Sequence, residues 1–171
     1  MFRLLALAGA VTCAVALSAG PVLAQQPAAP ASSANLPYGP PVTLDQAKRA
    51  MSAAELEAAK NSLQVAITIL DSGGNWVMFH RFDNTQLSSI QFSEGKARTA
   101  VDFKRPSKAL DDAIAGGGAG MRLLALKNIT PIEGGLPLIV DGKIIGAIGV
   151  SGALSSQDAQ IAKAGADALT R

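Results

Sequence analysis

The chain has 171 residues, with 15 lysines and arginines against 13 aspartates and glutamates, one histidine and one cysteine. Its formal net charge of +2 gives no strong field for nucleic acid or an anionic membrane, so neither is expected as a partner. One imidazole without a cysteine cluster is too little for a zinc site, which needs three or four ligands. The length fits a single domain with a core of its own.

The first segment, residues 1–24, has one charge at Arg3, an apolar run from position 4 to 17 and small residues up to Ala24. This pattern predicts a secretory signal peptide cleaved after Ala24, hence a periplasmic or secreted protein without a membrane span after cleavage. An uncleaved N-terminal anchor is the alternative. Cys13 lies inside the apolar run, so the mature chain is expected to have no thiol.

Residues 25–42 are rich in proline, alanine and serine. Such a composition favours extended, solvated chain, and this segment is predicted to be a tether or disordered arm. The folded domain is therefore expected over residues 43–171.

The first half of the domain predicts a helix and a hairpin. Thr43 and Gln46 have the spacing of a capping box, and the apolar positions that follow lie on one helical face over residues 44–60. Two β-rich segments, 63–70 and 76–82, flank the Gly-containing loop 71–75, which is typical of a hairpin.

The second half predicts helices over 88–104 and from Ser107 to about Ile114, because Pro106 separates them and Ser107 can cap the second. The glycine-rich stretch 115–120 predicts a flexible loop, and 121–127 fits either a helix or a strand. An Asp141-Gly142 turn predicts a closing hairpin over 136–150, after which Ser155 with Asp158 opens a last helix.

The order of helix, hairpin, helices, hairpin and helix predicts an α+β fold of profilin or PAS-like type, with an antiparallel sheet flanked by helices. The segments 66–70 and 144–150 are apolar on both faces, so helices or a second subunit are expected to cover both sides of the sheet.

His80 is the one histidine, and haem iron is the metal centre that a single axial ligand can serve, because the porphyrin supplies four nitrogens. An ordinary surface histidine is the alternative. Met121 is a second candidate ligand, although methionine usually fills gaps in a core.

A group of charged residues lies around the second predicted strand and the following helix, namely Arg81, Asp83, Lys96 and Arg98. Its cations suit carboxylates such as haem propionates, and an ion-paired surface is the alternative.

Three other patterns do not support catalysis. Ser151 lies in a Gly-x-Ser-x-Ala turn after a strand, but no histidine follows it to form a triad. Ser93 and Lys96 have Ser-x-x-Lys spacing without the other motifs of that enzyme class. The glycines at 116–120 lack the strand, lysine and helix context of a phosphate loop.

Four segments together resemble the haem-binding family that includes GlcG, the HbpS proteins and the C-terminal domain of PduO proteins. They are LDQAK at 44–48, VAITILDSGG at 65–74, KARTA at 96–100, and GGLPL to IGVSG at 134–152 with Gln157-Asp158 and Ile161-Ala. The resemblance covers about residues 43–170. It implies an α+β fold with a five-stranded antiparallel sheet, homo-oligomers, and haem binding in at least some members.

These observations lead to the hypothesis of an extracytoplasmic haem-binding protein that acts in sequestration, transport or sensing rather than in turnover. His80 is the expected iron ligand, Arg81, Lys96 and Arg98 the expected partners of propionates, and Phe79, Phe103 and Leu124 the expected apolar contacts, with Met121 as second-choice ligand. The alternative is a metal-free enzyme acting on a hydroxy acid or related carboxylate through Lys96, Arg81 and Asp83.

Overall fold

The computed structural model describes residues 33–170. The predicted signal peptide, Cys13 and the first part of the predicted arm lie outside these residues. Helices and strands within 33–170 follow the predicted order. In this part of the chain, no helix is long and apolar enough to cross a membrane.

The first helix, α1 (Leu44–Lys60), begins where its local sequence predicts. Thr43 Oγ1 accepts from the Gln46 N–H at 3.2 Å, and Gln46 Oε1 accepts from the Thr43 N–H at 2.9 Å. These two bonds form the predicted capping box, which satisfies donors that the first helical turn leaves free.

Both predicted hairpins are present. The first joins β1 (Ala66–Asp71) to β2 (Trp76–Arg81), and the second joins β3 (Gly135–Val140) to β4 (Lys143–Ser151). Asp141 and Gly142 have φ values of 49° and 68° in the second turn. This left-handed backbone is what a tight hairpin turn requires, and Asp-Gly adopts it readily.

The four strands form one antiparallel sheet in the order β2-β1-β4-β3. The antiparallel α+β class is confirmed, but the sheet has four strands and not the five that the resemblance implies. Beyond the end of β1, β4 pairs instead with the chain before α1: the Gly39 N–H donates to the Ile144 carbonyl at 2.8 Å, and Tyr38 forms an isolated bridge to Ile144. This bridge is too short to count as a strand.

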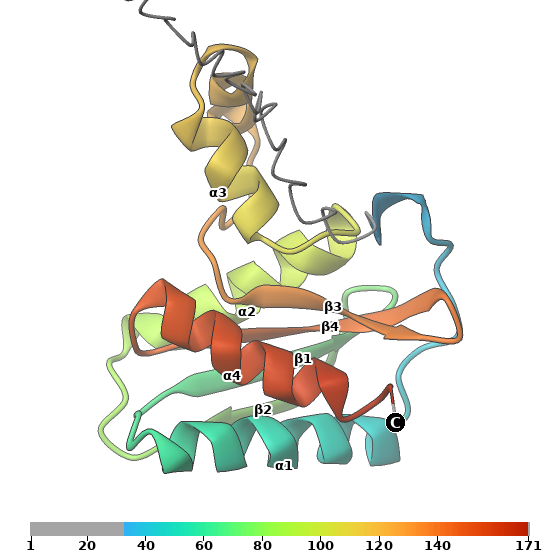
Figure 1. Cartoon of the computed structure of the whole chain (residues 1–171), viewed down its shortest axis with the longest axis vertical. Helices are drawn as coiled ribbons and strands as arrows, with labels where there is room; N and C mark the ends of the chain where they lie inside the picture. The colour runs from blue at the N-terminus through green and yellow to red at the C-terminus, as the bar shows by residue number, and fades with distance from the viewer. Residues whose placement is uncertain (1–32, 171) are drawn as a thin grey trace, which may run out of the picture. The chain divides into compact units, whose positions relative to one another are not determined.

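Helices cover both faces of the sheet, as the buried patterns of β1 and β4 predict. The helices α1 and α4 (Ser155–Asp167) pack on one face, and α2 (Ser88–Asp102) packs on the other (Figure 1). Ile67 and Ile69 of β1 belong to the core on the α1/α4 side, whereas Leu70 packs with Ala97 on the α2 side. Each face therefore has its own apolar cluster.

The last ten residues of the predicted arm, 33–42, differ from a free tether. They include the short 3-10 helix η1 (Ser33–Asn35) and the buried Val42. The Tyr38 hydroxyl donates to the Val101 carbonyl at 2.8 Å, and Lys104 Nζ lies 4.3 Å from the centre of the Tyr38 ring. In the described residues, the domain thus includes chain before Thr43.

Between α2 and β3 the chain forms α3 (Lys108–Ala115) and the 3-10 helix η2 (Gly118–Ala125), which contact mainly each other and stand apart from the sheet (Figure 1). The stretch that fitted either helix or strand is therefore mostly helical. Ser107 precedes α3 without a side-chain cap, contrary to prediction. Its hydroxyl instead donates to the Ile132 carbonyl at 2.6 Å and accepts from the Gly135 N–H at 2.9 Å.

Candidate functional site

His80 lies near the end of β2 and contacts α1. Its Nδ1 is 2.6 Å from Glu55 Oε1, and the two side chains are 44% and 33% exposed. An ionised carboxylate can only accept a hydrogen bond, so Nδ1 donates, and in the neutral imidazole Nε2 carries the free lone pair. Histidines that bind metals are commonly oriented in this way by a carboxylate at the other ring nitrogen.

Arg81 and Asp83 are exposed at the end of the same strand. Successive side chains of a strand point to opposite faces, so Arg81 and His80 point away from each other. The role of Arg81 as a partner for a haem propionate stays a prediction.

Lys96 is buried inside the domain, with 2% of its side chain exposed. Its Nζ donates to Asp158 Oδ2 at 2.8 Å and to the Val150 carbonyl at 3.0 Å. Gly134 covers the pair with φ +122°, and a Cβ there would lie 3.0 Å from Nζ. In this conformation the Lys96 ammonium group is buried and bonded to Asp158 and Val150, so a ligand carboxylate cannot reach it.

Asp158 was predicted to form a capping box with Ser155, but Gln157 makes that bond and Asp158 pairs with Lys96 instead. The Leu154 N–H at the start of α4 donates to Gln157 Oε1 at 3.2 Å, while Asp158 Oδ1 accepts from the Ala153 N–H at 3.0 Å. Burial raises the pKa of Asp158, and the hydrogen bond and charge of Lys96 oppose that rise. The sequence signal for its burial was available, because Asp158 shares a helix face with Ile161, Ala162 and Gly165.

Two of the four segments behind the family resemblance supply this buried cluster. KARTA supplies Lys96, and the last segment supplies Gly134, Val150 and Asp158. The resemblance therefore reflects in part an interaction that fixes α2 against β4 and α4.

The two serines with enzyme-like spacing are structural. Ser93 Oγ lies 2.9 Å from Thr68 Oγ1 and donates to the Ile90 carbonyl at 3.0 Å. Since Lys96 is bonded to Asp158, no Ser-Lys pair forms. Ser151 is buried at the end of β4, opposite Ala66 in the sheet.

Arg98 lies on the exposed side of α2. Its Nη2 donates to the Gly74 carbonyl at 2.8 Å and lies 3.7 Å from Glu94 Oε1. The Trp76 Nε1–H donates to the same carboxylate oxygen at 3.1 Å, and the Trp76 ring contacts Phe79 at a centroid distance of 5.4 Å. Arg98 and Glu94 also line a recess of about 390 Å³ between α2 and residues 128–130.

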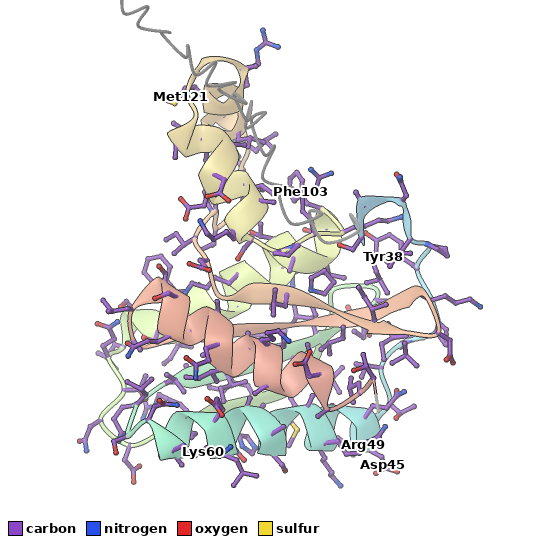
Figure 2. The ribbon with its side chains drawn as sticks, viewed as in Figure 1. Tyr38, Asp45, Arg49, Lys60, Phe103 and Met121 are labelled. Atoms are coloured by element: carbon purple, nitrogen blue, oxygen red, sulfur yellow. The ribbon has the colours of Figure 1, made fainter. Side chains whose placement is uncertain are left out.

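Phe103 and Met121 lie elsewhere. Phe103 ends α2 and is partly buried, and Met121 is 49% exposed on η2. Figure 2 shows Met121 on the part of the α3–η2 segment far from the sheet and Phe103 closer to the sheet. Leu124 is also exposed on η2, together with Leu126 just beyond it.

The predicted site residues are thus not brought into one pocket. His80 faces α1, whereas Arg98 is bound at the β1–β2 turn, beside α2. Gly74 lies in the turn before β2, and the four residue steps from Trp76 to His80 alone span roughly 13 Å at ~3.3 Å per residue. Sequence reasoning missed Glu55, Glu94 and Trp76, because their contacts join residues 18 to 25 positions apart. The alternative of a metal-free enzyme requires Lys96, Arg81 and Asp83 in one pocket. The structure does not bring them together, because Lys96 is enclosed.

Comparison with known proteins identifies the family. The family model for HbpS-like proteins, described as haem degrading protein HbpS-like, matches residues 42–167. The chain belongs to this family. The predicted resemblance to GlcG and HbpS proteins is confirmed.

Individual relatives agree with this assignment. Protein GlcG of Escherichia coli K12 is 38% identical over 59% of this chain and 74% of its own length. A double mutant of Streptomyces reticuli HbpS has 29% identity and a TM-score of 0.72, covering 90% of this chain and 99% of that one. A crystal structure of a PduOC–haem complex has 26% identity and a TM-score of 0.69, covering 77% and 99%.

Proposed function

We propose that this protein binds haem and that His80 Nε2 would be a ligand of the iron. The observation that carries the proposal is the similarity to the haem-bound PduOC chain, which the fold matches over almost its whole length. Membership of the HbpS-like family gives further support.

The donor groups of the described residues fit haem. Among residues 33–170, no group of three or more histidine, cysteine or acidic side chains could hold a bare metal ion. Haem supplies four porphyrin nitrogens, so its iron needs only one or two protein ligands. His80 provides such a ligand on a partly exposed ring.

Glu55 acts as a positioning residue in this proposal. By accepting the Nδ1–H of His80 at 2.6 Å, it fixes the tautomer and the orientation of the ring. Met78 lies two residues earlier on the same face of β2, partly buried against the α1/α4 core, and offers an apolar surface beside the imidazole.

Titration of the purified protein with haemin, followed by the Soret band, tests the proposal. We expect a saturable shift at micromolar haemin, and no shift would contradict haem binding. His80→Gly should remove the imidazole-ligated spectrum, and free imidazole should restore it. Glu55→Gln should weaken haem binding by about 10–100-fold. Lys163→Ala is a control, because Lys163 forms an exposed pair with Asp167 on α4.

If His80→Gly has the spectrum of the parent protein, His80 is not the ligand. Met121→Leu then tests the second predicted ligand by the same spectrum. If neither His80→Gly nor Met121→Leu changes the haem spectrum, both ligand assignments are wrong.

We also propose that the protein acts outside the cytoplasm as a homo-oligomer, in haem sequestration, transport or sensing. The N-terminal sequence supports export, and the apolar side chains exposed on η2, Met121 and Leu124, support association between copies. Cell fractionation and light scattering test these two points. A full-length cytoplasmic protein or a monomer at all concentrations would contradict them.

A further inference from the structure

The recess beside α2 has the features of a second ligand site. Gln91, Glu94, Gly95 and Arg98 line it from one face of the helix, at positions i, i+3, i+4 and i+7, and residues 128–130 close the other side. Its volume of about 390 Å³ lies near the lower end of the range for small-molecule pockets, which is roughly 300–1,000 Å³. That size suits a small metabolite rather than a porphyrin.

Both charged groups of the recess are held by contacts from outside their helix. Arg98 is fixed by the Gly74 carbonyl at 2.8 Å, and Glu94 is fixed by the Trp76 indole N–H at 3.1 Å. A guanidinium has five N–H donors and a carboxylate has two oxygens, so each group retains hydrogen-bonding capacity toward a ligand. Binding therefore needs little ordering of these side chains, which favours affinity.

The glycine at the centre of the helix face lets Thr130 pack directly against α2. A Cβ at Gly95 would collide with Thr130 Oγ1. Thr130 is held close to the helix, because its N–H donates to Thr99 Oγ1 at 2.7 Å. Asn128 has a φ of 64°, a left-handed backbone that asparagine tolerates, and Asn128 and Gln91 both line the recess.

We propose that this recess binds a small zwitterion of the α-amino acid class. The ligand carboxylate pairs with Arg98 and the ligand ammonium pairs with Glu94. A simple anion would meet the repulsion of Glu94, and a simple cation would meet that of Arg98. A molecule that carries an ammonium and a carboxylate on the same carbon atom can pair with both side chains, since Arg98 Nη2 and Glu94 Oε1 lie 3.7 Å apart.

This site is separate from the proposed haem ligand. Arg98 is bound at the turn before β2, and His80 is near the opposite end of that strand and faces α1. The two proposals therefore fail independently.

The test is an NMR titration of the protein with each of the twenty common L-amino acids. The best ligand is then compared with its deaminated acid and its decarboxylated amine, each of which lacks one charge. We expect saturable shifts of the α2 and 128–130 amides with the amino acid, and at least tenfold weaker binding of both analogues. No saturable binding below 10 mM, or equal binding of either analogue, would overturn the proposal.

Arg98→Gln and Glu94→Gln should each weaken binding at least tenfold while the amide spectrum stays folded. The matched control is the exposed i,i+4 pair on α3, Lys108 with Asp112, at 2.6 Å. Lys108→Gln and Asp112→Asn should bind the ligand as the parent does. Haemin titration of Glu94→Gln should be unchanged, which separates this site from haem binding. Parent-like amino acid binding by both recess variants would overturn the proposal.

Discussion

Lys96 and Arg98, two residues apart on α2, each form an ion pair, and the two pairs have different roles. Lys96 pairs with Asp158, 62 positions away, and the two side chains are 2% and 3% exposed. Arg98 pairs with Glu94, one helical turn away, and these side chains are 33% and 34% exposed. Burial, and not the type of charge, therefore separates a cation that holds the fold together from one that a ligand can reach.

The buried pair owes its effect to the groups around it. Taking two charges out of water is costly, and their attraction offsets that cost only with good geometry and further hydrogen bonds. Here the Val150 carbonyl and the Ala153 N–H supply those bonds. The pair therefore specifies how α2, β4 and α4 fit together more than it adds net stability.

The largest effect is expected from breaking the buried pair. Asp158→Ala leaves the Lys96 ammonium buried without its partner, which should lower the free energy of unfolding by about 3–5 kcal/mol. Glu94→Ala, which breaks the exposed pair, should cost less than about 1 kcal/mol. Urea unfolding of both variants measures the two free energies of unfolding.

The double variant Lys96→Met with Asp158→Leu checks the cause of that loss. It removes both charges at once, so it should be more stable than Asp158→Ala alone. Equal costs for the Asp158 and Glu94 variants would show that burial does not distinguish the two pairs.

A smaller effect is expected from adding one methyl group beside each pair. Gly134→Ala forces an alanine into a φ of +122° and brings its Cβ within 2.9 Å of the Val150 carbonyl oxygen, so a loss of about 2–4 kcal/mol is expected. Gly95→Ala displaces only the Thr130 side chain and gains up to about 1 kcal/mol in helix propensity, so its net cost should stay below that amount.

Thermal unfolding measures the stability of the two glycine variants. An amino acid titration then measures ligand binding by Gly95→Ala. Because the added methyl group displaces Thr130, which lines the recess, that variant should lose amino acid binding while it stays folded. A greater loss of stability for Gly95→Ala than for Gly134→Ala would contradict the expectation that a methyl group costs more beside the buried pair.

The smallest effect concerns the turn that anchors Arg98. Burial raises the pKa of Asp71, but hydrogen bonds from Asn75, Gly73 and Gly74 outweigh it, so the net pKa is lowered. The carboxylate then stabilises the turn above its ordinary pKa, and this contribution is lost as the pH falls through the lowered value.

Amide hydrogen exchange at Gly73 and Asn75 should therefore show more frequent opening of the turn in acid than at neutral pH, after correction for intrinsic exchange. Asp71→Asn cannot ionise and should lose this pH dependence. If the asparagine variant responds to acid as the parent does, another group controls the turn.

The sequence predicted local structure well and placed side chains less well. The Thr43 and Gln46 capping box and the Asp141-Gly142 turn were recognisable because each needs only residues within a few positions of one another. Lys96 was interpreted as a ligand-binding cation because its partner belongs to a distant segment. The face that Asp158 shares with Ile161 and Ala162 already indicated its burial, and that signal was missed.

By itself, the sequence determined the α+β class, the order of helices and hairpins, the buried strands and the family, because these depend on periodicity, turn chemistry and short motifs. The tertiary structure alone decided that Lys96 is enclosed by Asp158, that Glu55 orients His80, and that Arg98 and Glu94 border an open recess. The physical reason is that each of these roles depends on burial or on a long-range contact, and neither exists before the chain has folded.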